Sequence, residues 1–346
     1  MLSLESFSRM LHGKQVGIYK LRKGAYSAFI TNYGAKIVSL NVPNNEGVVR
    51  DVVLGFNTLG EWLDKETYFN AIIGRFANRI KDGVFSLDGR EYRLAVNNGT
   101  NHLHGGAIGF NERVWDVLDT SADSLVLRYV SPDGEEQYPG TLTLTVTYRL
   151  KQHSDGCDLD IRYEATTDAP TICGFTNHAY FNLKGEGCGN ILDHELTIHS
   201  DFYTPTDDSF APTGAVLPVG GTALDFRKPT LIGERINDPI YTASRGLDHN
   251  WVIRRHNVSE RLAHAATLRA DGVTMQVHTT LPGLQVYTGN WVEENTGKSG
   301  RQYGVQTAVC LEAQGFPNSP NISHFPSPVL RPGEKYDHRC VYRFCF

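Results

Sequence analysis

The chain has 346 residues, with 33 Lys and Arg against 38 Asp and Glu, which gives a formal charge of −5 at pH 7. It has no block of Lys and Arg that could neutralise a phosphate backbone, so we expect no nucleic-acid partner. Its apolar runs fall far short of the roughly 20 residues that span a bilayer, so we expect no membrane crossing. The N-terminus carries no recognisable secretory leader, which predicts a cytoplasmic protein.

Alternation of apolar and polar residues is the dominant pattern along the chain. In the segment 141–150, Leu142, Leu144 and Val146 alternate with threonines. This period of two predicts a half-buried strand, and it recurs at 159–163, 273–277 and 338–346. Strands of this type favour antiparallel sheets packed face to face.

Helical patterns are few. The best lie at 58–65 and 231–236, and both are short enough to be peripheral. Glycines and prolines punctuate the whole chain and are not concentrated in one linker, so nothing in the pattern marks a domain boundary. Six cysteines without a CxxC pair are too sparse for a disulfide scaffold, and we expect free thiols.

Five short segments place polar, ionisable or aromatic residues among Gly and Asn, where core packing alone would favour aliphatic side chains. They are GRFANRI (74–80), NHLHGG (101–106), TNHAYFNL (176–183), GLDHNW (246–251) and CLEAQGFPNSPN (310–321).

In the second segment, His102 and His104 would share one face of a strand, which is a possible start for a metal site. The next acid, Glu112, lies eight residues beyond His104, and no third ligand follows at a suitable spacing. Histidines bonded to backbone or satisfied in the core explain the pair better, so we expect no metal.

His178 and Glu312 are candidates for acid–base chemistry. An imidazole can donate or accept a proton near neutral pH. Glu312 ends the apolar run 306–311, where a carboxylate is costly unless it is paired or faces a cleft. A buried His bonded to a carbonyl and a structural salt bridge are the competing explanations.

Asp248 and Arg79 are candidates for binding a polar ligand. A carboxylate close to a tryptophan, here Trp251, can bind sugar hydroxyls beside an aromatic face. The guanidinium of Arg79 offers five donors in a planar fork. A surface-loop aspartate and an internal ion pair would explain these residues as well.

Taken together, the sequence resembles the aldose 1-epimerase (galactose mutarotase) family over nearly its whole length. The resemblance rests on YGAKIVSLNVPNNEG (33–47), GRFANRI, LHGG followed by GF and Trp115, TNHAYFNL, LDHNW, LQVYTGNW (284–291), LEAQGFPNSPN and LRPGEKYDH (330–338), in this order and at compatible spacings.

The resemblance implies an all-β fold: one domain over residues 1–346, built as a large antiparallel β-supersandwich (galactose mutarotase-like) with few short peripheral helices. It implies interconversion of the α and β anomers of free aldoses such as galactose or glucose, with no cofactor. The implied partner is a small-molecule sugar, and the protein would be a monomer or a homodimer.

By the same resemblance, Glu312 is the catalytic base, His178 is the acid and His104 assists. Positions that match sugar-contacting or site-wall residues of the family are Arg79, Asn78, Asp248 and Gln285. One departure is Gly174, which stands where the family usually has Asn or Ser, and we expect a local change with little effect on His178. Two alternatives stay open at this point: a carbohydrate-binding sandwich without catalysis, and a metal-dependent isomerase built on His102 and His104.

Overall fold

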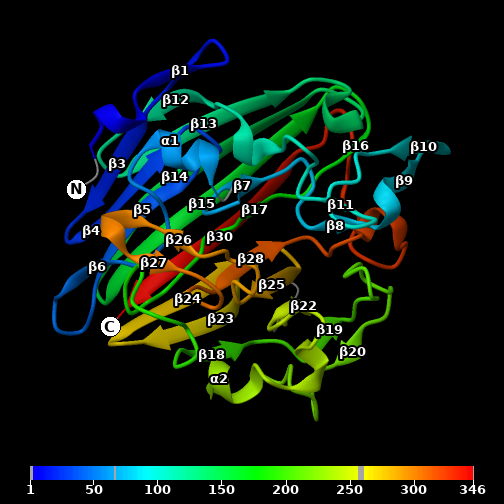
Figure 1. The fold of residues 1–346 in the computed structure, drawn as a ribbon. Helices are drawn as coiled ribbons and strands as arrows, with labels where there is room; N and C mark the ends of the chain where they lie inside the picture. The colour runs from blue at the N-terminus through cyan, green and yellow to red at the C-terminus, as the bar shows by residue number, and fades with distance from the viewer. Residues whose placement is uncertain (1–2, 66–67, 256–260, 346) are drawn as a thin grey trace.

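The computed structural model describes residues 3–65, 68–255 and 261–345. Antiparallel β-sheet dominates, and the central element of the fold is a nine-stranded sheet (Figure 1). Its strand order is β12 (Asp116–Thr120), β13 (Ser124–Ser131), β14 (Leu142–His153), β15 (Gly156–Thr167), β30 (Tyr336–Cys345), β24 (Val273–Thr279), β23 (Ala263–Ala270), β18 (Glu195–Ile198) and β21 (Thr230–Leu231).

The predicted alternation is confirmed in β14, where Leu142, Leu144 and Val146 are buried and the threonines between them are half-buried. The C-terminal strand differs slightly from its prediction. β30 ends at Cys345, and Phe346 lies outside the described residues. Val341, on the outward face of this strand, is buried as well, because it lies in mid-sheet between its cross-strand partners Asp160 and His278.

Two smaller sheets pack against the inner face of the large one. The five-stranded sheet has the order β20 (Leu217–Pro218), β19 (Phe202–Thr204), β22 (Asp248–Val252), β25 (Gly283–Tyr287) and β28 (Cys310–Gln314). The four-stranded sheet has the order β3 (Ile18–Lys23), β4 (Tyr26–Thr31), β5 (Ile37–Pro43) and β6 (Val49–Asp51).

Hydrogen bonds join these layers through the core. The Tyr342 hydroxyl of β30 donates to the Leu311 carbonyl of β28 at 3.1 Å, and the Tyr148 hydroxyl of β14 donates to the Ala35 carbonyl at 2.7 Å. Aliphatic and aromatic side chains from all three sheets belong to one buried cluster, so the sheets share a core.

Short two-stranded ladders complete the β-structure. They are β1 (Arg9–Leu11) with β2 (Lys14–Val16), β7 (Ile72–Ile73) with β17 (Thr176–Asn177), β8 (Arg79–Ile80) with β11 (His102–Leu103), β9 (Val84–Leu87) with β10 (Arg90–Arg93), β16 (Thr171–Ile172) with β29 (Val329–Leu330), and β26 (Asn295–Thr296) with β27 (Gln302–Tyr303).

Helices are short and lie at the periphery, as predicted (Figure 1). α1 (Leu59–Asp64) begins with a capping box in which Thr58 and Glu61 bind each other's backbone N–H, and α2 (Ile232–Arg235) is a single turn. The 3₁₀ helices are η1 (Glu5–Phe7), η2 (Lys81–Gly83), η3 (Phe110–Glu112), η4 (Glu135–Gln137), η5 (Pro239–Tyr241), η6 (Lys298–Gly300) and η7 (Ser319–Asn321). In the described part of the chain, no helix has the length and apolar character needed to cross a bilayer.

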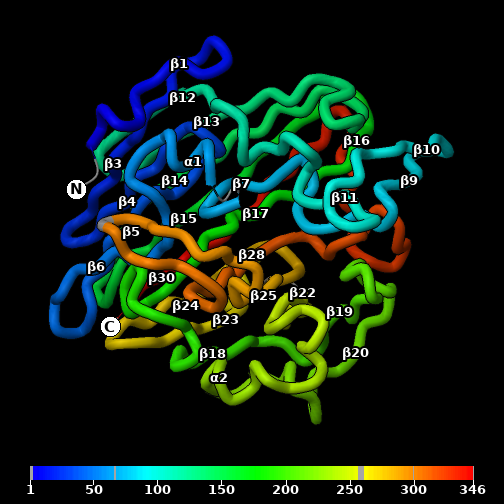
Figure 2. Tube along the Cα trace, in the orientation of Figure 1, coloured from blue at the N-terminus to red at the C-terminus, as the bar shows by residue number. Residues whose placement is uncertain are grey.

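The site is positioned where the small ladders meet the five-stranded sheet. The cyan segment with β11 runs beside the orange-red chain that follows β28 (Figure 2). The Asn318 N–H donates to the Arg79 carbonyl at 2.7 Å and fixes this contact. The ladder of β7 and β17 lies nearby and contacts β28 directly.

Candidate active site

Three adjacent strands of the five-stranded sheet place Glu312, Gln285 and Asp248 together. Gln285 on β25 is the direct cross-strand partner of Glu312 on β28 and of Asn250 on β22. Asp248 is two residues from Asn250, so its side chain leaves β22 on the same face. The Gln285 Nε2 donates to the Asp248 Oδ1 at 2.7 Å. Sheet register therefore brings two carboxyl groups and one amide to a common face.

His178 follows β17 and faces Glu312. Its backbone is held on both sides, because its N–H donates to the Ala71 carbonyl and its carbonyl accepts from the Asn70 N–H, both at 2.9 Å. The His178 Nε2 lies 3.5 Å from the Glu312 Oε1. Among the described residues, neither the His178 Nδ1 nor the Glu312 Oε2 has a hydrogen-bond partner. Each group thus keeps hydrogen-bonding capacity for a ligand.

His104 and Asn78 hold each other through two hydrogen bonds. The His104 N–H donates to the Asn78 carbonyl, and the Asn78 N–H donates to the His104 Nδ1, both at 3.1 Å. An Nδ1 that accepts a bond leaves the proton of the neutral imidazole on Nε2. The ring of His104 lies 5.3 Å from that of His178, and it can offer an Nε2–H to a ligand beside it.

Arg79 is fixed above the same face. Its Nε donates to the Asn98 Oδ1 at 3.1 Å, and its guanidinium lies 5.4 Å from the centre of the Phe210 ring. The distance from its Nη1 to the Asp248 Oδ2 is 3.9 Å, at the limit of an ion pair. This spacing leaves donors of Arg79 free to bind hydroxyl oxygens.

All seven predicted site residues line one cavity of about 430 Å³. They are Asn78, Arg79, His104, His178, Asp248, Gln285 and Glu312. Aromatic side chains that sequence reasoning did not assign to a site form much of the remaining wall: Tyr68, Tyr180, Phe210, Tyr287 and Trp291. Tyr180, Tyr287 and Trp291 lie in the TNHAYFNL and LQVYTGNW motifs, which could have indicated them. Tyr68 and Phe210 lie outside every recognised motif.

Burial dominates the electrostatics of the cavity. It raises the pKa of Glu312 well above its ordinary value, and the negative charge of Asp248 adds to this, while Arg79 acts in the opposite direction. Burial lowers the pKa of His178 to about 4 and that of His104 well below its ordinary value. Burial therefore favours the neutral forms of all three groups.

His102 does not join this site. Its Nδ1 contacts the Ala95 carbonyl at 2.7 Å, and its Nε2 contacts the Tyr138 hydroxyl at 2.6 Å. The prediction that His102 and His104 share a strand face is wrong, because β11 ends at Leu103 and His104 adopts a φ of +52°. Across the described residues, no three His, Cys, Asp or Glu side chains converge on a point where a metal could bind. The metal-isomerase alternative thus lacks a ligand set there.

Gly174, the departure from the family pattern, lies at a parallel bridge to Phe76. Its N–H donates to the Arg75 carbonyl, and its carbonyl accepts from the Ala77 N–H. A Cβ at this position would meet the Phe76 ring at 3.6 Å, an ordinary van der Waals distance. The local backbone therefore does not require glycine.

Comparison with known proteins shows the family. The family model described as aldose 1-epimerase matches residues 17–343. The chain belongs to the aldose 1-epimerase family. It is 42% identical to human galactose mutarotase over 336 residues, which cover 96% of this chain and 95% of the relative. It is 33% identical to the aldose 1-epimerase of Escherichia coli K12 over 318 residues, 91% of each chain.

Solved structures of this family have the same fold. A structure of an aldose epimerase homologue from C. elegans superposes with a TM-score of 0.86 at 30% identity, covering 95% of this chain and 98% of that one. A galactose 1-epimerase from Lactobacillus acidophilus superposes with a TM-score of 0.82 at 28% identity, covering 97% and 96%. The predicted galactose mutarotase-like fold is confirmed, and the enzyme class of this family member is aldose 1-epimerase.

Proposed function

We propose that the protein interconverts the α and β anomers of a free aldose, with galactose and glucose as the first candidates. The observation that carries the proposal is the buried pair of His178 and Glu312, with 3.5 Å between Nε2 and Oε1 and unpaired capacity on each group. Relatives named galactose mutarotase and aldose 1-epimerase support the same reaction.

The reaction needs one base and one acid. Glu312 removes the proton of the C1 hydroxyl while His178 delivers a proton to the ring oxygen, so the bond between C1 and the ring oxygen breaks and an aldehyde forms. Rotation about the C1–C2 bond presents the other face of the carbonyl. Ring closure returns both protons and restores the two side chains to their starting states, so no further reactant is consumed.

One shared proton is enough for this cycle. The neutral pair, with the proton on Glu312, contains the same number of protons as the ion pair, with the proton on His178. Burial lowers the pKa of His178 to about 4 and raises that of Glu312, so burial by itself favours the proton on Glu312. We propose that bound hydroxyls and Arg79, which already acts to lower the pKa of Glu312, shift the proton toward His178.

His104 and the polar residues of the cavity wall would orient the sugar. The Nε2–H of His104 can donate to an oxygen beside the reacting bond. Arg79 can donate to hydroxyl oxygens, while Asp248 and Gln285, fixed to each other at 2.7 Å, can accept and donate. Asn78 would act as a positioning residue through His104. The cavity volume of about 430 Å³ lies within the range of about 300–1,000 Å³ common for small-molecule sites.

Polarimetry tests the proposal. Crystalline α-D-galactose or α-D-glucose is dissolved, and the decay of optical rotation is followed with and without catalytic amounts of protein. Faster decay with the protein supports catalysed anomer exchange. Sugar binding by calorimetry without any acceleration would favour the alternative of a carbohydrate-binding protein without catalysis.

A further inference from the structure

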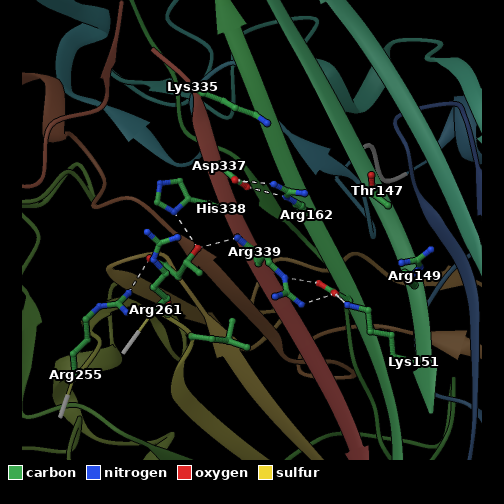
Figure 3. A pocket seen from close by; sticks show the side chains of 13 residues that line it. Thr147, Arg149, Lys151, Arg162, Arg255, Arg261, Lys335, Asp337, His338 and Arg339 are labelled. Atoms are coloured by element: carbon green, nitrogen blue, oxygen red, sulfur yellow. Dashed lines mark hydrogen bonds and ion pairs between the residues drawn. The ribbon is translucent and has the colours of Figure 1, made fainter. Parts of the chain in front are cut away.

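A second large cleft lies on the outer face of the nine-stranded sheet. It has a volume of about 880 Å³ and shares no lining residue with the catalytic cavity. Its floor is formed by β14, β15 and β30, and long basic side chains rise from these strands (Figure 3). The opposite face of the same strands carries core residues such as Leu150 and Ile161.

Basic side chains predominate in the lining of this cleft. Among the described residues, seven Lys and Arg side chains line it against two carboxylates, Asp160 and Asp337, an excess of five positive charges. Glu164, just outside the lining, binds Arg162 and Lys335, and counting it leaves an excess of four. The whole chain has a formal charge of −5, so the cleft is a local reversal of sign.

The register of the sheet places like charges opposite each other at the centre of the cleft. Arg162 on β15 is the direct cross-strand partner of Arg339 on β30. Like charges in this position are destabilising. Each guanidinium binds its own carboxylate: Arg162 contacts Asp337 at 2.8 and 2.9 Å, and Arg339 contacts Asp160 at 2.6 and 3.1 Å.

The carboxylates of the cleft are shared among too many cations to neutralise them all. Asp160 binds Lys151 as well as Arg339. Arg149 and Arg261 are exposed, and among the described residues neither has a carboxylate within ion-pair distance. Arg149 lies opposite Asp160 in the sheet, but the Asp160 carboxylate is already bound by Lys151 and Arg339. Both exposed guanidinium groups therefore keep donors for an anionic ligand.

Other polar groups in the cleft are already fixed in direction. The Arg255 Nη2 donates to the Thr280 carbonyl at 2.8 Å and to the Leu281 carbonyl at 3.1 Å. The Thr280 hydroxyl contacts the His338 Nδ1 at 3.0 Å and accepts from the Arg339 N–H at 2.8 Å. A ligand would meet a wall in which several side chains have already lost conformational freedom, which lowers the entropic cost of binding.

We propose that this cleft binds a small phosphorylated anion, either a phosphorylated sugar or a free inorganic phosphate or pyrophosphate. Guanidinium groups match phosphate oxygens with paired hydrogen bonds, and five of the seven cations are arginines. A long polyanion would extend beyond the cleft over a molecule of net negative charge, which favours a small ligand.

Isothermal titration calorimetry on the full chain, in about 50 mM salt to limit screening, tests the proposal with inorganic phosphate, pyrophosphate, glucose 6-phosphate and glucose. We expect saturable one-to-one binding of at least one phosphorylated probe and no comparable heat at this site from glucose. Tighter binding of glucose 6-phosphate would identify a sugar phosphate as the source, and tighter binding of pyrophosphate would identify the inorganic anion.

Variants locate the binding. Arg149→Gln with Arg261→Gln removes two exposed cations that have no ion pair among the described residues. The double variant should bind the phosphorylated probe about tenfold or more weakly. The matched control is Arg331→Gln, which removes an exposed arginine paired with Asp88 away from the cleft and should leave affinity unchanged. Absence of saturable binding, equal binding by the double variant, or binding of heparin but of no small probe would each overturn the proposal.

Discussion

The Nδ1 of His104 accepts the backbone N–H of Asn78, while the backbone N–H of His104 donates to the Asn78 carbonyl, so each residue fixes the other. The consequence is chemical as well as structural. With Nδ1 occupied as an acceptor, the neutral ring must carry its proton on Nε2, the nitrogen left to face a ligand.

This relationship predicts different outcomes for two substitutions of His104. In His104→Asn, the Oδ1 can still accept the Asn78 N–H, but nothing replaces the Nε2–H. In His104→Gln, the side-chain Nε2 can take over that donor position. We expect kcat to fall by about tenfold to a hundredfold in the Asn variant and by less in the Gln variant.

Asn is well suited to the φ of +52° at residue 104, so the Asn variant should fold. Polarimetric kcat and KM for both variants check the prediction. Wild-type activity in the Asn variant would show that the Nε2–H has no role.

The pH profile should reveal the buried pair. Activity requires one proton shared by His178 and Glu312. As the pH falls, a second proton binds the pair and leaves it without a base. Because burial lowers the pKa of His178 to about 4, activity should persist through pH 5–6 and fall only near pH 4. At high pH the pair loses its shared proton and activity falls. Because the pKa of Glu312 is raised, this fall should lie at a higher pH than an ordinary carboxyl would give.

Initial rates of optical-rotation change, corrected for buffer catalysis and measured from about pH 4 to 9, test this profile. An acid limb near 6.5, the ordinary value for histidine, would contradict the account of His178.

Glu312 should reduce stability at neutral pH. Its pKa is raised on folding, so between the unfolded and folded values the native state holds more protons, and the free energy of unfolding falls as pH rises. The Glu312→Gln variant has no carboxyl to ionise, so it lacks this fall in the free energy of unfolding. The variant should therefore gain stability relative to wild type on going from pH 5 to pH 8, as measured by thermal unfolding. A difference independent of pH would argue that the carboxyl is not perturbed.

Asn70 supports the segment that carries His178. Its Nδ2 donates to the Ile37 carbonyl at 2.7 Å and to the Leu54 carbonyl at 2.6 Å, and its Oδ1 accepts from the Tyr180 N–H at 2.9 Å. Asn70→Ala leaves three buried backbone groups unpaired at about 1–3 kcal/mol each, so unfolding free energy should fall by at least about 3 kcal/mol.

Urea denaturation measures this loss. Asn41→Ala is the matched control, because the half-buried Asn41 amide makes a hydrogen bond to Ser39 at 3.0 Å, and its removal should cost about 1 kcal/mol or less. Equal losses in the two variants would refute the role of Asn70.

The alternation of apolar and polar residues predicted four of the nine strands of the large sheet, β14, β15, β24 and β30. The pattern is clearest in β14, which alternates between one buried and one half-exposed face. The sequence also indicated His178 and Glu312, although 134 positions separate them, because each lies in a recognisable motif. The structure places both on one cavity. Their roles, the single domain, the oligomeric state and the cytoplasmic location stay predictions.

Other features depend on distances that no local pattern encodes. Tyr68 and Phe210 reach the cavity from segments without a motif. The tautomer of His104 depends on a backbone N–H from residue 78, and the pKa of Glu312 depends on burial by the whole fold. The like-charge contact of Arg162 and Arg339 follows from the pairing of β15 with β30, which lie far apart along the chain.

The most direct test of the central claim is polarimetric mutarotation of α-D-galactose by wild type and Glu312→Gln, with thermal unfolding as evidence that the variant folds. Loss of the base should lower the catalysed rate by about 10²–10⁴-fold while the fold is retained. A folded Glu312→Gln variant with near wild-type rates would contradict the assignment of Glu312 as the base.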